Sequence, residues 1–409
     1  MLCRQRYGQS ESKGLFSLNN QEYIQIHDDN VMHTYGRFPV VIDHARGACA
    51  WDADGKKYID FGSGIGTNSL GYCDEGWVRA VEEQLTRVQH VSNYFYTPSS
   101  ALFAQKLMQI TGYSKVFLCN SGAEANECAL KIARKYSFDT YAKKERSTII
   151  TLKNSFHGRT VTTLSATGQD EFHNYFFPFT EGFRFAQANH MESVLEQFDD
   201  TVCAVMVEFI QGEGGVLPLE PEFVAELSKF CRDHDLLLIG DEVQTGVGRT
   251  GTFCCCEQYG VKPDVLTSAK GLGGGLPIGA CLCREGLEQV LTPGTHGSTF
   301  GGNPVVCAGG IEVLNRLSTP GFLEEVRKKG EYLRSSLLNM SEVQSVRGLG
   351  LMLGADLKTK AAKKVCARCV EEGLFTLTAK TSMRFLPPLT ITYDELDEGL
   401  AILRRVLAE

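Results

Sequence analysis

LLLIGDEVQTGVGRTGTFCCCEQYGVKPDVLTSAKGLGGG, residues 236–275, is the stretch that decides the fold of this chain. It contains two short apolar runs, LLLIG and VLTSA, which predict buried strands. Each run is followed by one charged residue, Asp241 after the first and Lys270 after the second. Their separation, 270 − 241 = 29 positions, is about one βα unit. Ligands of open α/β sheets bind outside the carboxyl ends of the strands, so this acid and lysine indicate a site.

The surroundings of Lys270 distinguish it from an ordinary surface lysine. The run before it is too apolar for an exposed strand, and the segment GLGGG at 271–275 lets backbone approach a ligand closely. A lysine and a carboxylate so placed suit pyridoxal phosphate, because the amine bonds to the cofactor aldehyde and the acid keeps the pyridine nitrogen protonated. A carboxylate about 4 Å from that nitrogen contributes roughly 4 kcal/mol at an effective dielectric of about 20, or some three pKa units. We therefore predict that Lys270 shuttles protons and Asp241 sustains the electron sink.

The length of the chain predicts two domains, because 409 residues exceed one compact core. We expect a large α/β domain over 61–305 and a small α+β domain built from 1–60 and 306–409. Residues 40–64 are typical of a small antiparallel meander, which we group with the C-terminal part of the chain. The first ~30 residues are polar and predict a loose arm or a short helix.

Charge and cysteine usage exclude several classes of protein. A net charge of −8 and a pI near 5.7 argue against nucleic acid or an anionic membrane as partner. The fifteen cysteines are odd in number and lie mostly in apolar runs, which favours buried, reduced thiols. Cys366 and Cys369 would share one face of a helix, and packing is favoured over metal because nothing completes a zinc set. We predict no metal site.

The N-terminal arginines and serines leave an organelle transit peptide as a minor alternative, but other targeting signals are not expected. The N-terminus lacks the apolar core of a signal peptide, and no window reaches the roughly 18 apolar residues of a membrane span. We therefore expect a cytoplasmic protein without a membrane partner.

Residues 115–136, KVFLCNSGAEANECALKIARKY, predict a strand, a tight glycine turn and a helix that starts at about Ser121. The free amides and positive dipole end of such a helix can hold a phosphate. Serine and glycine are equally favoured in an ordinary helix cap, so both interpretations stay open.

A further strand leads to Phe156 and Arg159. The phenylalanine could pack in the core or stack on a flat cofactor ring. The arginine could lie on the surface or bind a carboxylate with both prongs of its guanidinium.

Six motifs of the chain are distinctive when taken together: SGAEANE at 121–127, FHGRT at 156–160, IQGEGG at 210–215, GDEVQTGVGRTG at 240–251, AKGLGGGLPIGA at 269–280 and HGSTFGGNP at 296–304. As a set they resemble the class III pyridoxal phosphate aminotransferases, from about Thr34 to the C-terminus. The resemblance implies an α/β protein with the aspartate-aminotransferase-like fold type I, a large mixed-sheet domain, a small α+β domain and pyridoxal 5'-phosphate as cofactor. It also implies a homodimer with a shared active site.

The resemblance assigns expected roles to individual residues. Lys270 would bond the cofactor and Asp241 would pair with its pyridine nitrogen. The other expected cofactor residues are Ser121, Gly122 and Ala123 at the phosphate, Phe156 and Val243 on the two ring faces, Gln244 at the phenolic oxygen, Glu242, and Thr299 at the phosphate of the neighbouring subunit's cofactor.

Five residues are expected to select the substrates. Arg159 and Ser298 would bind the substrate end remote from the reacting amine. Arg384 would bind the α-carboxylate of 2-oxoglutarate or glutamate, and Glu213 would neutralise Arg384 when the other substrate is bound. Ile65 resembles the acetylornithine type of the family, because the ornithine type carries a tyrosine there.

Within the family, the resemblance is strongest to members that act on N2-acetyl-L-ornithine. It implies transfer of the δ-amino group to 2-oxoglutarate, with N-acetyl-L-glutamate 5-semialdehyde and L-glutamate as products, in arginine biosynthesis. Relatives acting on ornithine, 4-aminobutyrate, succinylornithine or succinyl-diaminopimelate are alternatives, and a non-catalytic cofactor-binding protein is a remote one. Two positions depart from the family pattern: Phe209 replaces a proline, and Gly240 replaces a bulkier apolar residue. We expect both to alter packing rather than chemistry.

Overall fold

The computed structural model describes residues 18–409 of the chain. Residues 1–17, part of the predicted arm, lie outside the described residues. The remainder of that region forms helix α1 (Asn20–Asn30), which confirms the short-helix alternative for this part. Asn19 caps the helix, since its side chain accepts the Glu22 N–H while the Glu22 carboxylate accepts the Asn19 N–H.

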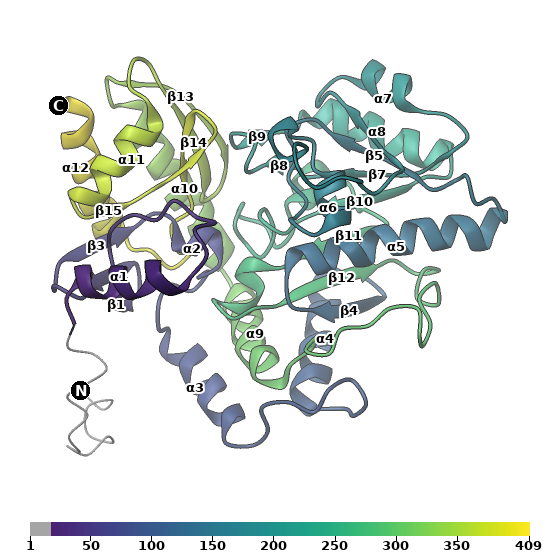
Figure 1. Cartoon of the computed structure of the whole chain (residues 1–409), viewed down its shortest axis with the longest axis horizontal. Helices are drawn as coiled ribbons and strands as arrows, with labels where there is room; N and C mark the ends of the chain where they lie inside the picture. Colours follow the sequence, from purple (N-terminus) through teal and green to yellow (C-terminus); the bar gives the residue numbers. More distant parts are fainter. Residues whose placement is uncertain (1–17) are drawn as a thin grey trace.

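A seven-stranded sheet forms the centre of the larger part of the molecule, on the right of Figure 1. Strand β12 is antiparallel to both of its neighbours, whereas the other neighbouring strands are parallel, so the predicted mixed sheet is confirmed. In spatial order the strands are β4 (Lys115–Cys119), β12 (Gly279–Cys283), β11 (Val265–Ser268), β10 (Leu237–Asp241), β7 (Val202–Val207), β5 (Thr148–Leu152) and β6 (Phe183–Ala186).

The two apolar runs of the deciding stretch are confirmed as the buried strands β10 and β11. They are parallel neighbours, and Asp241 lies opposite Thr267 in the register. The connection between them differs from the predicted βα unit, because its regular structure is the short 3-10 helix η2 (Cys255–Tyr259). Glycines interrupt the segment before η2, and Gly248 and Gly251 have φ values of 80° and 93°. Residues with such backbone conformations end a helix, so the connection forms turns and not a continuous helix.

Alternate residues of the central strands face opposite sides of the sheet. Leu237 and Ile239 pack in the apolar cluster that contains Ala129 of α5, whereas Leu238 packs in the cluster that contains Leu227 of α8. Strands covered on both faces read as continuous apolar runs, which is why LLLIG shows no alternation. The helices around this sheet are α3 (Glu75–Leu85), α4 (Pro98–Thr111), α5 (Gly122–Tyr141), α6 (Val161–Ala166), α7 (Met191–Gln197), α8 (Pro221–Asp233) and α9 (Pro304–Leu317).

Two four-stranded sheets lie in the other part of the molecule, on the left of Figure 1. One has the order β1-β2-β3-β15, so residues from both ends of the chain form it. The domain boundaries drawn from the sequence stay a prediction. The elements of this part are β1 (Ile42–Arg46), β2 (Cys49–Asp52), β3 (Lys57–Asp60), α10 (Phe322–Leu338), β13 (Val343–Leu349), β14 (Met352–Leu357), α11 (Ala362–Glu371), β15 (Leu374–Phe375), β16 (Leu377–Ala379), β17 (Ser382–Phe385) and α12 (Tyr393–Ala408).

The two departures from the family pattern, Phe209 and Gly240, are in contact. A Cβ atom at Gly240 would lie 3.1 Å from Cε2 of Phe209 and 2.7 Å from Cγ of Pro263. The Phe209 side chain is fully buried. The large ring therefore occupies space that a side chain at position 240 would need. The expectation that both positions alter packing rather than chemistry stays a prediction.

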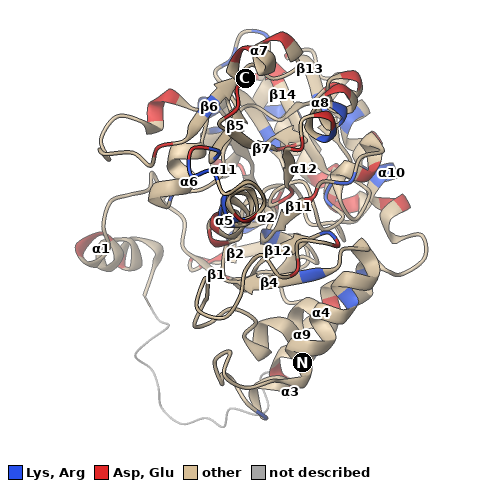
Figure 2. Cartoon of the chain, turned by 90° about the vertical axis from the view of Figure 1, so that its right-hand side faces the viewer, with Lys and Arg blue, Asp and Glu red and all other residues tan. Residues whose placement is uncertain are grey.

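Charges and cysteines are distributed as the sequence indicates. Acidic and basic residues are interspersed on α8 and α10 (Figure 2). Cys366 and Cys369 are both buried on α11, which confirms the packing interpretation. Within residues 18–409, no helix combines the length and apolar character needed to cross a bilayer.

Candidate active site

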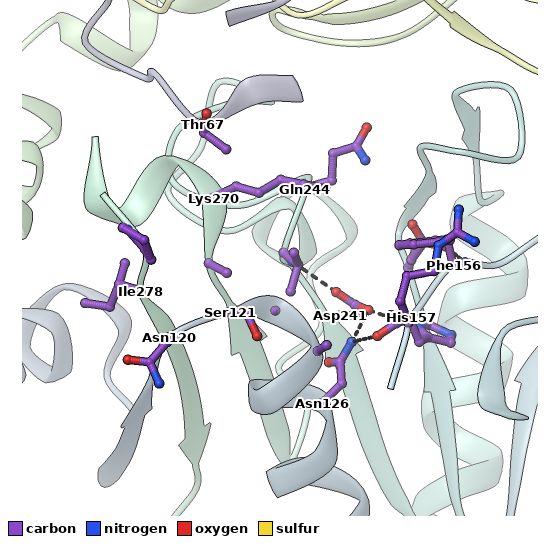
Figure 3. A pocket seen from close by; sticks show the side chains of 18 of the residues that line it. Thr67, Asn120, Ser121, Asn126, Phe156, His157, Asp241, Gln244, Lys270 and Ile278 are labelled. Carbon is purple, nitrogen blue, oxygen red and sulfur yellow. Dashed lines mark hydrogen bonds and ion pairs between the residues drawn. The ribbon is translucent and has the colours of Figure 1, made fainter. Parts of the chain in front are cut away.

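A cavity of about 440 Å³ opens at the carboxyl ends of β10 and β11. Figure 3 shows Lys270, Asp241 and Phe156 arranged around it. The acid and the lysine predicted from the deciding stretch thus share one cavity. Nine of the residues predicted for the site line it: Ser121, Gly122, Ala123, Phe156, Arg159, Asp241, Val243, Gln244 and Lys270.

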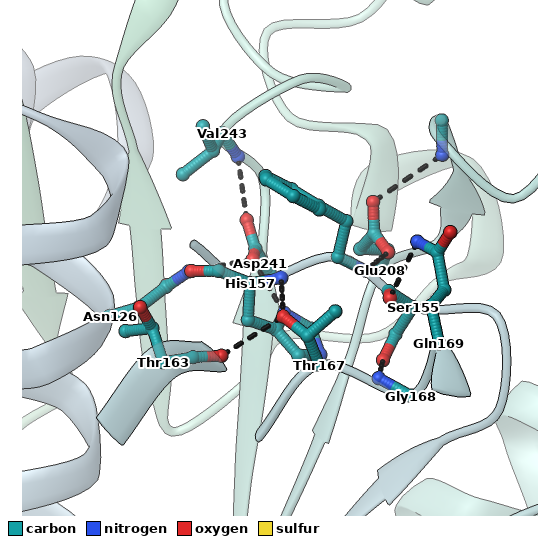
Figure 4. Close-up of polar contacts among 12 residues, drawn as sticks. Asn126, Ser155, His157, Thr163, Thr167, Gly168, Gln169, Glu208, Asp241 and Val243 are labelled. Atoms are coloured by element: carbon teal, nitrogen blue, oxygen red, sulfur yellow. Dashed lines mark hydrogen bonds and ion pairs between the residues drawn. The ribbon is translucent and has the colours of Figure 1, made fainter. Parts of the chain in front are cut away.

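Asp241, the last residue of β10, is held by donors on every side. Its Oδ2 atom lies 2.7 Å from Nδ1 of His157 and accepts a hydrogen bond of 2.8 Å from Nδ2 of Asn126. Its Oδ1 atom accepts the backbone N–H of Val243 at 3.0 Å (Figure 4). The side chain is buried. These bonds fix the orientation of the carboxylate, as the partner of a ring nitrogen requires.

Sequence reasoning missed His157 and Asn126, although both lie in motifs that it quoted. His157 is buried, and its Nε2 atom has no hydrogen-bond partner among the described residues. Asn126 is a polar residue between the buried alanines 125 and 129 of α5, and it also donates to the carbonyl of His157 at 2.7 Å. A polar side chain on an otherwise apolar helix face was the signal that could have identified it.

Lys270 follows β11 and begins the 3-10 turn η3 (Lys270–Gly273). Its φ of 45° lies in the left-handed region, which is rare for a lysine and is found at sites where the surroundings impose it. Burial lowers the pKa of Lys270 below its ordinary value, and the charge of Arg384 acts in the same direction. Glu213 and Asp241 oppose the shift. A lowered pKa increases the share of neutral amine, which is the form that attacks a carbonyl and accepts a proton.

The start of α5 fits a phosphate group. Ser121 caps the helix, because its Oγ atom accepts the Glu124 N–H at 3.2 Å, and the helix start predicted at about Ser121 is confirmed. Gly122 and Ala123 line the cavity in the first turn, where helix amides have no partner within the helix. A Cβ atom at Gly122 would lie 2.6 Å from Cγ1 of Val243, so a side chain there would displace the valine. The turn is therefore an ordinary cap whose first amides also face the cavity.

Arg384 of β17 is buried and paired with an acid. Its Nη1 atom donates to Oε1 of Glu213 at 2.5 Å and to Oε1 of Gln244 at 3.2 Å. Burial alone raises the pKa of Glu213, but the charge and hydrogen bond of Arg384 outweigh it and hold the pKa below its ordinary value. The expected neutralising contact is thus present. The Gln244 amide is engaged in this group, and its expected bond to the phenolic oxygen stays a prediction.

Glu208 is a buried acid next to the site. It accepts the backbone N–H of Phe156 at 2.8 Å and that of Gly212 at 3.4 Å (Figure 4). Burial, reinforced by the charge of Asp241, raises the pKa of Glu208 well above its ordinary value. Glu208 therefore joins the loop after β5 to the loop after β7 and holds the backbone of Phe156.

Six of the predicted site residues lie outside the cavity lining of the single chain: Glu213, Glu242, Arg384, Ser298, Thr299 and Ile65. Ser298 accepts hydrogen bonds from Nδ2 of Asn120 at 3.0 Å and from the Gly301 N–H at 3.1 Å. Thr299 and Ile65 are exposed. Their expected roles stay predictions.

Glu242 is bonded to the segment that leads to η2. Its buried carboxylate accepts the Thr245 hydroxyl at 2.5 Å and the Cys256 N–H at 2.7 Å, and it does not line the cavity. These bonds stabilise the turn toward η2, and the expected cofactor role of Glu242 stays a prediction.

Comparison with known proteins agrees with this geometry. The sequence model for aminotransferase class III matches residues 31–407. The chain is 47% identical over 394 residues to an acetylornithine aminotransferase of Haemophilus ducreyi, covering 96% of this chain and 100% of that one. It is 43% identical over 379 residues to the acetylornithine aminotransferase of Aquifex aeolicus, covering 92% and 99%.

Two solved structures illustrate the match in fold. The ornithine aminotransferase of Toxoplasma gondii superposes with a TM-score of 0.91 at 32% identity, covering 96% of this chain and 95% of that one. The N-acetylornithine aminotransferase of Stenotrophomonas maltophilia superposes with a TM-score of 0.82 at 35% identity, covering 94% and 98%. With the lysine, the acid and the start of α5 in one cavity, these matches show that the chain belongs to the class III aminotransferases, which depend on pyridoxal phosphate.

Proposed function

We propose that this protein transfers the δ-amino group of N2-acetyl-L-ornithine to 2-oxoglutarate, giving N-acetyl-L-glutamate 5-semialdehyde and L-glutamate, a step of arginine biosynthesis. The observation that carries this proposal is the contrast between two arginines near Lys270. Arg384 is buried and neutralised by Glu213, whereas Arg159 lines the cavity without a charged partner among the described residues. Two acidic substrates of different length can then use one cavity. The curated relatives, at 40–47% identity, support the acetylated donor.

The residues of this chain divide the work between binding and proton transfer. The first amides of α5 would hold the cofactor phosphate, Phe156 and Val243 would enclose the ring, and Asp241 would keep its nitrogen protonated. When bound, pyridoxal phosphate supplies an aldehyde that captures the amino donor and a ring that withdraws electrons from the substrate carbon.

Lys270 would take the proton from the substrate carbon and return it one position away, a task to which its lowered pKa is suited. Arg159 would bind the carboxylate of acetylornithine. Glu213 would release Arg384 when 2-oxoglutarate enters, so that Arg384 can bind the α-carboxylate.

Ornithine is the second candidate donor. The fold of the ornithine aminotransferase from Toxoplasma gondii matches this chain with a higher TM-score than that of the Stenotrophomonas enzyme. Ile65, where the ornithine type carries a tyrosine, favours the acetylated donor.

A panel of amino donors decides between these substrates. The purified holoenzyme is assayed with 2-oxoglutarate and, in turn, N2-acetylornithine, ornithine, 4-aminobutyrate, succinylornithine and succinyl-diaminopimelate. We expect the highest kcat/KM with N2-acetylornithine. A higher kcat/KM with any other donor contradicts the proposed substrate. If the protein loaded with pyridoxal phosphate turns over none of the donors, the proposal that it transfers an amino group from one of them is wrong.

We also propose that the enzyme is a cytoplasmic homodimer whose two active sites are shared between subunits. Thr299 and Phe300 are exposed on a loop that Asn93 joins to the exposed aromatic residues 94–96, since Nδ2 of Asn93 donates to the carbonyls of Ser298 and Gly301 at 2.9 Å each. Contiguous exposed aromatic side chains are typical of an interface.

Mixed dimers test the shared site. Lys270→Ala and Thr299→Ala subunits are unfolded, mixed and refolded together with the cofactor. If Thr299 serves the partner's site, each mixed dimer holds one site with both native residues, and activity at limiting cofactor exceeds that of either parent. Activity no higher than the sum of the parents contradicts a shared site.

A further inference from the structure

Arg159 has an unusual environment for a residue expected to bind a carboxylate. Its side chain lines the cavity and is exposed, and within residues 18–409 it forms no hydrogen bond or ion pair. Its Cζ atom instead lies 4.1 Å from the centre of the Phe172 ring and 5.5 Å from the centre of the Phe156 ring. The guanidinium thus rests on aromatic faces while its hydrogen-bonding edges stay free.

The segment that carries Phe172 is fixed to the loop that carries Arg159. Phe172 ends the 3-10 turn η1 (Asp170–Phe172). Just before it, the Gly168 N–H donates to Oγ of Ser155 at 3.0 Å, and Nε2 of Gln169 donates to the Ser155 carbonyl at 3.0 Å (Figure 4). A Cβ atom at Gly168 would lie 2.1 Å from the Leu152 carbonyl oxygen, so the two segments are in direct backbone contact.

Phe172 also contacts the ring expected to cover the cofactor. The rings of Phe156 and Phe172 are 6.1 Å apart and inclined by 75°, an edge-to-face pair. Phe172 therefore touches both the cofactor-side phenylalanine and the substrate-side arginine, although it is absent from the cavity lining itself. A residue in this position can orient the arginine without binding the substrate.

We propose that Phe172 is a positioning residue for substrate recognition: its ring holds the Arg159 guanidinium flat, so that the free edge of the fork faces the carboxylate of the amino donor. This inference rests on the proposed function, since it assumes that Arg159 binds that carboxylate. An arginine that packs against nothing loses the conformational entropy of its long side chain when it binds a carboxylate. A stacked arginine is already ordered and loses less entropy. An aromatic face also attracts a guanidinium cation directly.

The substrate class follows from the same geometry. The effect of Phe172 is confined to donors that carry a carboxylate at the end remote from the reacting amine. A carboxylate-free amine makes no use of Arg159 and is insensitive to Phe172. Phenylalanine and tyrosine offer the same ring face, so Phe172→Tyr retains the function, and Phe172→Leu removes the face while keeping an apolar side chain.

The experiment compares wild type, Phe172→Leu, Phe172→Tyr, Arg159→Ala and the double variant Arg159→Ala/Phe172→Leu as loaded enzymes. Each is assayed with N2-acetylornithine and with its carboxylate-free counterpart N-acetyl-1,4-diaminobutane, and single-turnover rates give kcat/KM for both. Calorimetric binding of N2-acetyl-L-norvaline, which has the carboxylate but no reacting amine, gives a Kd independent of turnover.

We expect Phe172→Leu to raise KM for N2-acetylornithine and the Kd of N2-acetyl-L-norvaline by about three- to ten-fold, with kcat within about two-fold of wild type. The carboxylate-free amine should react at an unchanged rate, and Phe172→Tyr should behave as wild type. In the double variant the leucine should add nothing to the effect of Arg159→Ala, because Phe172 acts through that arginine.

Four results would overturn the inference. A Phe172→Leu variant that slows both donors equally has lost general packing, and one whose effect adds to that of Arg159→Ala acts independently of the arginine. If Phe172→Leu has no effect while Arg159→Ala raises KM, Phe172 does not position the arginine, and the proposed function is unaffected. If Arg159→Ala itself leaves KM unchanged, the proposed role of Arg159 is wrong, and the inference about Phe172 is wrong as well.

Discussion

The two ends of the active-site cavity hold charge in opposite ways. At the inner end, Asp241 is buried and accepts bonds from His157, Asn126 and the Val243 backbone. At the outer end, Arg159 is exposed and unpaired by any acid among the described residues, and it rests on an aromatic ring. The inner charge serves one permanent cofactor, so fixed partners can hold it. The outer charge must receive and release substrates, so a permanent acid there would compete with them.

Arg384 lies between these extremes. It is as buried as Asp241, yet its acid partner Glu213 belongs to a loop and can be exchanged for a substrate carboxylate. A buried ion pair is costly to break by removing one partner, but exchange of one carboxylate for another preserves the pairing. The comparison of fixed, exchangeable and free charges leads to four experiments, from the largest expected effect to the smallest.

Replacement of Lys270 by alanine should abolish the function that both ends serve. We expect kcat to fall by at least about 10³-fold, because no other lysine among the described residues lines the cavity to move the proton. The variant should also lack the yellow colour of the covalently attached cofactor. Absorbance spectra and steady-state rates with N2-acetylornithine measure both effects. A yellow, active variant would show that another residue carries the chemistry.

Asp241→Asn tests the inner end. The substitution keeps the shape of the side chain but removes the charge, which is worth roughly 4 kcal/mol at about 4 Å from the ring nitrogen, so we expect kcat/KM to fall by about 100- to 1000-fold. Cofactor affinity, measured by equilibrium dialysis, separates a loss of binding from a loss of rate. A decrease smaller than about ten-fold would mean that the fixed carboxylate is not needed as a charge.

Glu213→Gln tests the exchangeable pair through its effect on Lys270. The negative charge of Glu213 raises the pKa of Lys270 and the positive charge of Arg384 lowers it, so removing the acid should lower the pKa of Lys270 further. The neutral amine captures the cofactor, and the capture rate of the apoprotein rises as pH passes through this pKa. The midpoint of the rate profile should therefore move to lower pH in the variant.

The control for this profile is Asp199→Asn, which removes a carboxylate that lies outside the cavity and pairs with Arg184. Its midpoint should match that of wild type. A shift to higher pH in Glu213→Gln would contradict the assigned sign of the interaction.

Gly240→Ala tests packing beneath the inner end without changing any charge. The new Cβ atom would lie 2.7 Å from Pro263 and 3.1 Å from Phe209, and such overpacking costs about 1–3 kcal/mol of the free energy of unfolding. We expect a lower Tm but a KM for N2-acetylornithine within about two-fold of wild type, because Arg159 is untouched. Gly36→Ala is the matched control, since its Cβ would meet nothing within 4 Å. Equal stability of the two variants would contradict the packing account.

Much of the inner end could be predicted from the sequence, and the reason is local. Strand ends and helix starts are encoded by short runs, so Asp241, Lys270 and the Ser121 turn could be located from neighbouring residues. The roles of His157 and Asn126 as partners of Asp241 could not be predicted, because they come from contacts across 84 and 115 positions of the chain. Glu242 shows a similar limit: adjacent residues after a strand point in different directions, and only the packed structure shows that Asp241 and Val243 line the cavity whereas Glu242 does not.

The sequence by itself determined the class of fold, the cofactor chemistry and the lysine and acid that serve it, because these depend on patterns within single segments. Only the folded chain shows what surrounds each charged side chain. A helix and a loop hold Asp241, Glu213 pairs with Arg384 across 171 positions, and Arg159 lies on the Phe172 ring. These surroundings come from distant segments of the chain, and folding brings those segments together.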